Sequence, residues 1–140
     1  MTVVKHIMEK IIPTIEYNKS AIDAAKLIIE KNSGFVIILQ NKKPIGIITE
    51  NDYMKKIITK NKLALEVPLK DIMSYKIHSV KPSTEIENAI QKMLNNNIKR
   101  LLVFENNEII GVVTQAGLAS YLRNKLLIDS TIKKIDSSKT

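Results

Sequence analysis

Residues 45–52 read IGIITEND, and residues 110–117, which begin 65 positions later, read IGVVTQAG. Each stretch is an apolar run that contains a glycine and stops at a threonine. Only the first continues to an acid, Asp52, whereas the second has Gly117 at the matching position. Such self-similarity at a fixed offset is the signature of an internal repeat. The sequence therefore predicts two copies of one structural unit.

The same offset of 65 relates further pairs along the chain. His6–Met8 aligns with Asp71–Met73, and Ala24 aligns with Ala89, with no gap needed between these anchors. Both copies share one rhythm: an extended piece, a helix, two apolar runs and a second helix. These elements are expected at 13–17, 20–32, 35–39, 45–49 and 51–60, and at 78–82, 84–97, 101–104, 109–114 and 115–127.

Local patterns sharpen these expectations. Asn41–Lys42 and Asn106–Asn107 separate the paired apolar runs and favour tight hairpin turns. Thr84 and Glu87 have the spacing of a capping box for the later helix. The apolar faces of the first helix of each copy are predicted to consist of Ile22, Ala25, Ile28 and Ile29, and of Ile86, Ile90, Met93 and Leu94.

Gly46 and Gly111 lie inside predicted strands, where glycine normally weakens a sheet. Their presence in both copies indicates close approach by another backbone or by a ligand, and a bulge or a tight sheet contact is the alternative. The runs around them are apolar without alternation, which is typical of strands that are covered on both faces.

Composition narrows the function classes. The 140 residues include no cysteine, which excludes disulfides, thiolate metal sites and cysteine nucleophiles. His6 and His78 lack the clustered partners of a metal site. With no acid pair, nucleophile–base pair or phosphate-binding glycine loop in sight, we do not expect an enzyme. No apolar run is long enough to span a bilayer, and a cytoplasmic location without membrane contact is expected.

The formal charge is +8, and each half of the chain carries an equal share of it. A basic protein of this kind could bind nucleic acid or the phosphates of a nucleotide. The simpler interpretation, which we favour, is a lysine-rich solvated surface. The interleaved aromatic residues that single-stranded nucleic acids require are missing, because only 4% of the residues are aromatic.

The end of the first repeated stretch carries its own chemistry. Thr49 at a strand end and Asp52 in the first turn of the following helix would present both side chains at one mouth. A carboxylate that accepts two hydroxyl protons suits a ribose diol. The alternative is that Thr49 or Asp52 only caps the helix.

The order of elements, the DIM-type start, the ending (V/I)-G-(I/V)-(I/V)-T-x-x-D and the tandem arrangement resemble a pair of cystathionine β-synthase (CBS) domains, also called a Bateman module. The resemblance covers most of the chain, from Val3 to about Leu127. It implies an α/β fold of two β-α-β-β-α repeats packed through their sheets with pseudo-twofold symmetry. The expected boundaries are 1–62 for repeat 1, 63–70 for a linker, 71–128 for repeat 2 and 129–140 for a C-terminal tail that frays from about Asp136.

Proteins of this family commonly bind AMP, ADP, ATP or S-adenosylmethionine between the two repeats. Carried over to this sequence, the resemblance assigns the ligand to Ile47, Thr49, Asn51, Asp52, Ile77, His78, Ile98, Lys99 and Arg100. Arg100 would hold phosphate, since a planar guanidinium suits that group better than a mobile lysine; an exposed charge at a strand edge is the alternative. His78 could contact the base or be a surface histidine.

The symmetry-related site looks weaker. It would be formed by Ile12, Pro13, Gly34, Val112 and Thr114, together with Ser33, Ala116 and Gly117. There the acid has become Gly117, and Phe35 stands where the first site has Arg100. The expected function is a nucleotide-sensing regulatory module that acts through an unknown protein partner or as a homodimer. The alternative is a nucleic-acid-binding or scaffold module that uses the basic surface.

Overall fold

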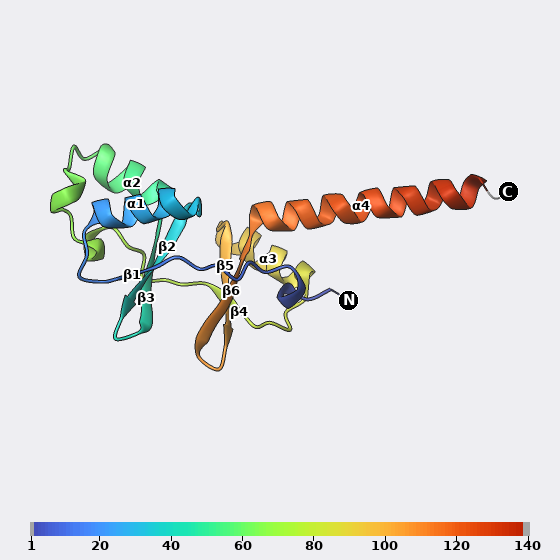
Figure 1. The fold of residues 1–140 in the computed structure, drawn as a ribbon, viewed down its shortest axis with the longest axis horizontal. Helices are drawn as coiled ribbons and strands as arrows, with labels where there is room; N and C mark the ends of the chain where they lie inside the picture. The colour runs from blue at the N-terminus through green and yellow to red at the C-terminus, as the bar shows by residue number, and fades with distance from the viewer. Residues whose placement is uncertain (1, 139–140) are drawn as a thin grey trace. The chain divides into compact units, whose positions relative to one another are not determined.

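The computed structural model describes residues 2–138, without the side chains of 136–138, and divides them into two compact units (Figure 1). One unit is continuous and runs from Ile11 to Ile77. The other joins residues 2–10 to residues 78–138. The start of the chain therefore belongs to the core of the second copy.

The continuous unit has the predicted order of elements. Its strands and helices are β1 (Thr14–Glu16), α1 (Ala21–Lys31), β2 (Phe35–Gln40), β3 (Lys43–Thr49) and α2 (Glu50–Tyr53), followed by a π-helix at Met54–Ile58. β1 is parallel to β2, and β2 is antiparallel to β3, in the sheet order β1-β2-β3. The helix expected at 51–60 thus changes its winding after one turn.

The second unit repeats this topology. It contains a 3-10 helix at Val4–His6, β4 (Ser79–Val80), α3 (Ile86–Asn96), β5 (Arg100–Glu105), β6 (Glu108–Thr114) and α4 (Gln115–Ser138). The sheet order is β4-β5-β6, and its pairing irregularity at Val103/Phe104 matches the one at Ile38/Leu39. The α/β fold of two β-α-β-β-α repeats is confirmed.

The two hairpins turn as the sequence predicts. Asn41 and Lys42 both have positive φ, 51° and 64°, and Asn106 and Asn107 have 52° and 64°. Two consecutive residues with positive φ are the requirement of a type I′ turn, whose twist matches that of the strands. The asparagines supply a residue type that tolerates this conformation.

The predicted helix faces were partly wrong. The residues that α1 buries are Ala21, Ala24 and Ile28, whereas Ile29 is 79% exposed. The residues that α3 buries are Ile86, Ala89 and Met93, whereas Leu94 is 67% exposed. These two sets match at the offset of 65. Apolar residues lie on most sides of α1, so periodicity alone was ambiguous there, whereas the face predicted for α3 was wrong mainly at Leu94. The small alanines allow each helix to approach its sheet.

The capping box predicted for α3 is also wrong. α3 begins after Glu85, and the Thr84 hydroxyl oxygen instead accepts the N–H of Lys81 at 3.1 Å. The equivalent helix α1 does begin with reciprocal capping: the Ser20 N–H donates to Asp23 Oδ2 at 3.1 Å. Those hydrogen bonds, from the Ser20 amide first and its hydroxyl second, hold the pKa of Asp23 below its ordinary value.

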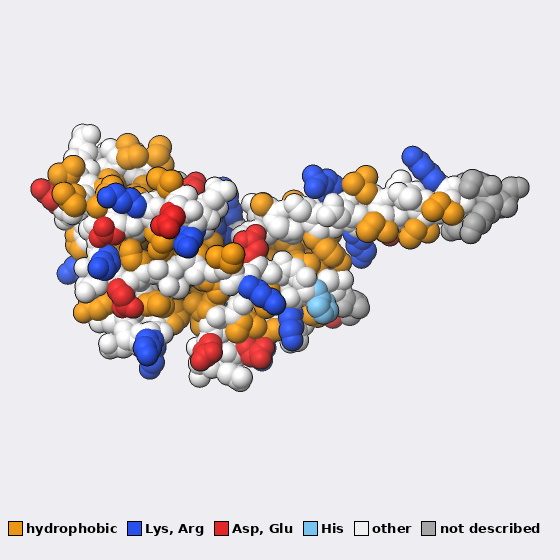
Figure 2. Space-filling model, viewed as in Figure 1, with side chains coloured by type: hydrophobic (Ala, Val, Ile, Leu, Met, Phe, Trp, Pro, Cys, Tyr) orange, Lys and Arg blue, Asp and Glu red, His pale blue; other side chains and the backbone are white. Residues whose placement is uncertain are grey.

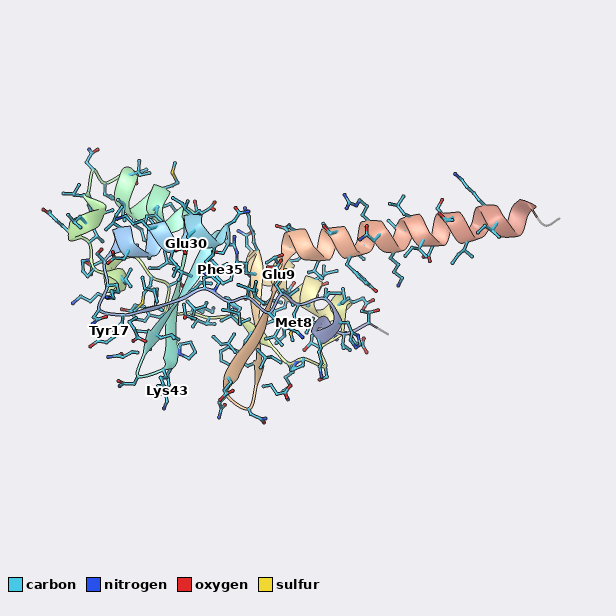
Figure 3. The ribbon with its side chains drawn as sticks, viewed as in Figure 1. Met8, Glu9, Tyr17, Glu30, Phe35 and Lys43 are labelled. Atoms are coloured by element: carbon cyan, nitrogen blue, oxygen red, sulfur yellow. The ribbon has the colours of Figure 1, made fainter. Side chains whose placement is uncertain are left out.

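Both strand glycines lie where another backbone crosses. A Cβ on Gly46 would lie 2.7 Å from Met73 Sδ and 3.0 Å from the Ser74 carbonyl oxygen. Ser74 exchanges backbone hydrogen bonds of 2.9 and 3.0 Å with Ile47. The same arrangement holds at Gly111, with Met8 and Glu9 beside β6 (Figure 3). Close approach by a backbone is therefore observed at both glycines. The alternative, a bulge, is observed as well, because Gly46 pairs with Ile38 and Gly111 with Val103, where the strand register shifts.

The segment expected to be a linker adds to the continuous unit. Val67 and Leu69 are buried in the same cluster as Ile72, Met73 and the α1 face. Two 3-10 helices, Ala64–Glu66 and Leu69–Asp71, shape this segment.

At the other end of the chain, α4 extends eleven residues past the predicted end at 127, and the expected fraying from Asp136 is not seen as far as Ser138. Residues 139–140 lie outside the described part.

Candidate functional site

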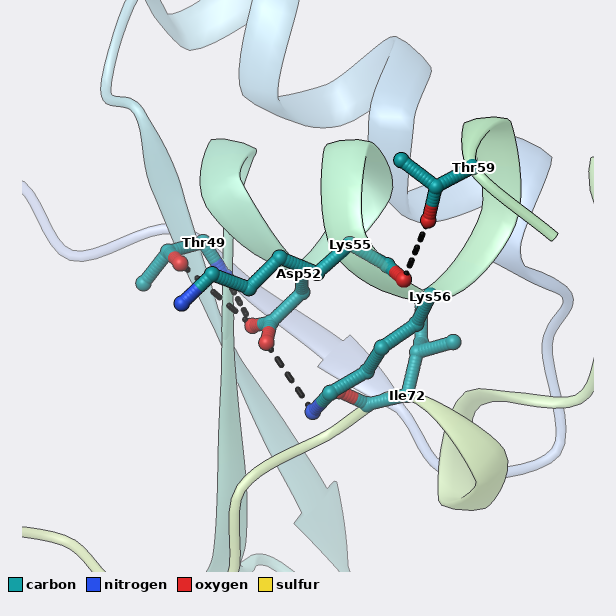
Figure 4. A network of polar contacts seen from close by, with 6 residues as sticks. All are labelled: Thr49, Asp52, Lys55, Lys56, Thr59 and Ile72. Atoms are coloured by element: carbon teal, nitrogen blue, oxygen red, sulfur yellow. Dashed lines mark hydrogen bonds and ion pairs between the residues drawn. The ribbon is translucent and has the colours of Figure 1, made fainter.

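The acid Asp52 lies in the first turn after β3, where Thr49 ends the strand (Figure 4). The Thr49 N–H donates to Asp52 Oδ2 at 2.8 Å, and the Thr49 hydroxyl is 3.4 Å from the same oxygen. The carboxylate therefore caps the start of α2, which was one of the two roles considered for Asp52 from the sequence. The capping engages one oxygen of the carboxylate most strongly and leaves the other to a different partner.

That partner is Lys56, one helical turn further on. Lys56 Nζ lies 3.0 Å from Asp52 Oδ1 and donates to the Ile72 carbonyl oxygen at 2.7 Å (Figure 4). The side chain of Asp52 is 16% exposed and that of Lys56 is 39% exposed. Because partial burial reduces screening by water, this ion pair holds its geometry better than a fully exposed one.

Tyr53, the last residue of α2, links this helix to the start of α1. Its hydroxyl donates to the Ala21 carbonyl oxygen at 2.7 Å. Burial of the phenol and, to a lesser extent, the negative charge of Asp52 raise the pKa of Tyr53. Tyr53 therefore stays neutral at physiological pH and fixes α2 against the start of α1.

The equivalent place in the second copy has a different polar chemistry. Thr114 ends β6, and its hydroxyl oxygen accepts the N–H of Gly117 at 3.0 Å. Tyr121 occupies the position that matches Lys56, and its hydroxyl donates to Thr2 Oγ1 at 2.7 Å. The carboxylate and the lysine are thus both replaced in this copy, although the threonine cap is kept.

The predicted site residues fall into both units. In the continuous unit, Ile47 is on β3, Thr49 ends that strand, Asn51 and Asp52 are on α2, and Ile77 ends the unit. In the other unit, His78, Ile98, Lys99 and Arg100 lead into β4 and β5. Within its own sheet, Arg100 is the register partner of Thr114, and Phe35 is the register partner of Thr49. Within each sheet, the threonine that ends the last strand thus pairs with a different residue type: an aromatic side chain in the first copy and an arginine in the second.

The residues of the weaker predicted site are more buried. Ile12, Pro13 and Gly34 lie in the continuous unit, and Val112 and Thr114 lie on β6. Pro13 and Gly34 are buried, and their carbonyl oxygens accept the N–H groups of Ile37 and Glu50. Val112 is completely buried and pairs with Glu9. These groups are used by the fold itself.

Sequence reasoning missed Lys56, which holds the second oxygen of Asp52. The signal was present, because an acid followed four residues later by a lysine on a helix is a favourable pair. It also missed that residues 72–74 pack on the first copy and supply the carbonyl that Lys56 contacts.

The described residues hold no cluster of three or more His, Cys, Asp or Glu side chains that could bind a metal ion. Nor do they form a helix with both the length and the apolar character to cross a bilayer.

Known proteins resemble this chain over most of its length. The CBS domain family model matches residues 4–59 and 69–124. The uncharacterized protein MJ1426 of Methanocaldococcus jannaschii is 31% identical over 85% of this chain and 90% of its own length. The uncharacterized protein MK0525 of Methanopyrus kandleri is 37% identical over 69% of this chain, and the match spans half of that protein.

Solved structures agree with these matches. A protein with CBS domains from Burkholderia ambifaria superposes with a TM-score of 0.82 at 25% identity, over 86% of this chain and 93% of its own. The CBS domain pair of protein MJ0100, crystallised with 5′-methylthioadenosine and S-adenosyl-L-methionine, superposes with a TM-score of 0.77 at 27% identity, over 86% and 99%. The two matched segments, the repeated topology and these superpositions show that the chain belongs to the CBS-domain family and contains a tandem pair of CBS domains.

Proposed function

We propose that this protein is a regulatory module that binds an adenosine ligand through the carboxylate of Asp52. The observation that carries the proposal is the fixed orientation of that carboxylate, with Thr49 on one oxygen and Lys56 on the other. A carboxylate has about four lone-pair sites, so acceptor positions remain for the two hydroxyls of a ribose. The crystallisation of the MJ0100 CBS pair with two adenosine compounds supports this ligand class.

Arg100 is the proposed phosphate partner, on the ground of its chemistry. It is one of two arginines among 22 basic residues, and a planar guanidinium can bind phosphate with two parallel hydrogen bonds. The other residues that the family resemblance assigns would contact the base and the sugar. They are Ile47, Thr49, Asn51, Ile77, His78, Ile98 and Lys99.

The experiment measures Kd by calorimetry for adenosine, 5′-methylthioadenosine and AMP. Asp52→Ala should weaken all three by roughly 10- to 150-fold, because a charge-assisted hydrogen bond is worth about 1.5–3 kcal/mol. Arg100→Ala should weaken AMP by a similar factor and leave the two phosphate-free ligands nearly unchanged. Arg123→Ala, which changes the net charge equally, serves as the matched control.

Binding of AMP by folded Asp52→Ala as tightly as by the parent would refute this assignment. A competing function is nucleic-acid binding, which the charge of +8 favours. In that case the chain would bind DNA or RNA with an affinity that falls steeply with salt, and it would show no preference for adenosine compounds.

We further propose that the protein acts without catalysis, as a homodimer or through a protein partner. Apolar side chains exposed on the helices that follow Thr49 and Thr114 support association. The more exposed ones are Met54 and Ile58 after α2, and Leu126, Leu127, Ile128 and Ile132 on α4, where apolar and basic side chains line the helix (Figure 2). Sedimentation equilibrium tests this: Leu126→Glu/Ile132→Glu should shift a dimer to a monomer.

A further inference from the structure

The ion pair of Asp52 also points to a residue outside the assigned ligand set. We propose that Lys56 is a positioning residue for the nucleoside site: it holds Asp52 in the orientation that accepts a ribose diol. This inference rests on the proposed function, because it names what orders the proposed ligand-binding carboxylate.

The geometry gives Lys56 two anchors. Its ammonium lies 3.0 Å from Asp52 Oδ1 and donates to the Ile72 carbonyl oxygen at 2.7 Å (Figure 4). Ile72 is 1% exposed and belongs to the core of the continuous unit. The ammonium is therefore tied to a rigid backbone atom, and a mobile lysine becomes a fixed point for the carboxylate.

The two oxygens of Asp52 are then fixed from opposite directions. The Thr49 N–H holds Oδ2 at 2.8 Å and Lys56 holds Oδ1. Rotation of the carboxylate about its last bond would break one of these contacts. Holding a binding group in its bound orientation before the ligand arrives removes part of the ordering entropy that binding would otherwise cost.

The second copy supports a link between the two residues. Where the acid becomes Gly117, the lysine position becomes Tyr121. Tyr121 still ties its helix to the preceding segment, through Thr2, but it brings no charge. A tie between helix and segment is thus common to both copies, whereas the positive charge accompanies the carboxylate. This pattern is the one that a positioning role predicts.

The test compares ligands that differ only in the diol. Lys56→Met keeps the unbranched side chain as far as Cε and removes the ammonium, and Lys60→Met, at an exposed lysine of the same unit, removes the same charge elsewhere. Kd is measured by calorimetry for adenosine and for 2′,3′-dideoxyadenosine, after circular dichroism has verified folding. If Lys56→Met does not reach the folded baseline, Lys56→Gln replaces it.

We expect Lys56→Met to weaken adenosine by about 10-fold, the scale on which removing a supporting hydrogen-bond partner weakens metal sites. Binding of 2′,3′-dideoxyadenosine should change less than twofold, and Lys60→Met should change neither. Lys56→Arg, which restores the charge, should recover most of the adenosine affinity. In the background of Asp52→Asn, Lys56→Met should have no further effect.

Two results overturn the inference while the proposed function stands. One is that Lys56→Met binds adenosine as tightly as Lys60→Met although Asp52→Asn loses binding. The other is that Lys56→Met weakens both ligands equally, which indicates a structural tie only. If the parent and Asp52→Asn bind adenosine alike, the proposed function itself fails and the role of Lys56 fails with it.

Discussion

The first turns after Thr49 and after Thr114 occupy equivalent places in the two copies, yet they carry different chemistry. After Thr49 come a carboxylate, a lysine and a tie to Ile72. After Thr114 come a glycine that donates its N–H to the threonine and a tyrosine tied to Thr2. Both turns begin their helices with a capped strand end. The hydrogen-bonded cap at the threonine is therefore common to both copies, whereas the ion pair of Asp52 and Lys56 occurs only in the first.

Elsewhere the copies are closely alike. The buried positions of α1 and α3 match at the offset of 65, as do the hairpin turns and the methionine that packs against each strand glycine. The cores and hairpins therefore match, whereas the copies differ in their polar groups: the turns after Thr49 and Thr114 carry different side chains, and α3 lacks the capping found at α1.

The largest effect is expected from cutting the chain at the wrong place. A fragment of residues 1–66 lacks four buried residues of the first core, Val67, Leu69, Ile72 and Met73. At about 1.5–3 kcal/mol each, their loss equals the whole stability of a small domain. The fragment 11–77 should retain more helical signal in circular dichroism. If fragment 1–66 melts cooperatively, with a melting temperature equal to or above that of fragment 11–77, then residues 67–77 are not needed for the first core.

The strand glycines test whether the two frames are equivalent. Gly46→Val and Gly111→Val should each destabilise the protein by about 1–3 kcal/mol, because the new side chain meets the methionine sulfur and a backbone carbonyl oxygen. Urea unfolding measures both values. If one variant is nearly neutral and the other is not, the copies pack differently and the comparison fails at the level of the core.

Ligand affinity tests the difference between the two turns. Asp52→Ala should weaken adenosine by roughly 10-fold or more, whereas Thr114→Ala should change its Kd by about twofold or less. Calorimetry of the parent should give one adenosine per chain. Two equally tight sites would show that the missing carboxylate at Gly117 does not matter, and that the asymmetry lies elsewhere.

A smaller effect is expected from copying the cap of the first turn into the second. In Gly117→Asp the new carboxylate can accept the N–H of Thr114, as Asp52 accepts that of Thr49. The change also replaces glycine in a helix, but the added Cβ would lie 3.1 Å from Thr114 Oγ1, so that hydroxyl must shift slightly. Thermal melting should therefore show a gain of at most about 1 kcal/mol. Gly117→Ala is the control for the helix effect alone, and an equal gain there would rule out a contribution from the cap.

The smallest effect concerns pH. Asp23 caps α1, and its lowered pKa means that its contribution to stability is present above its ordinary value of 3.8 and is lost as pH falls through the folded-state pKa. The second copy has Asn88 at this position. Asp23→Asn should therefore be less stable than the parent at pH 6, and the difference should shrink below about pH 3.8. A difference that stays constant with pH would exclude the carboxylate as its source.

Much of the frame could be predicted from the sequence. The repeat offset, the asparagine turns and the apolar runs each have a local cause, and the structure follows them. The buried face of α1 could not be predicted from periodicity, because the helix carries apolar side chains on most of its sides. The alignment of Ala24 with Ala89 carried the missing signal, since an alanine kept in both copies marks the helix side nearest the sheet, and both alanines are completely buried.

The polar partners were harder to predict. Thr49 and Asp52 are three residues apart, and their pairing follows from helix geometry. The tie from Lys56 to Ile72 joins residues 16 apart through a segment that looked like the start of the second copy. The motif His6–Met8 likewise belongs to the core that forms with residues 78–138. Local patterns identify such segments but do not say which core receives them.

Residues 2–10 pack with residues 78–138 and not with the residues that directly follow them. Because a chain is synthesised from its N-terminus, this arrangement affects the order in which the two units fold. Residues 11–77 are complete once the seventy-seventh residue has left the ribosome. Val4, whose N–H donates to the Thr84 carbonyl oxygen, must wait for its partners to be made. At about 5–20 residues per second, translation from residue 78 to residue 138 takes several seconds. Residues 2–10 thus emerge before residues 11–77 but are fixed after them, and a substitution at Val4 would act on the folding of the second unit.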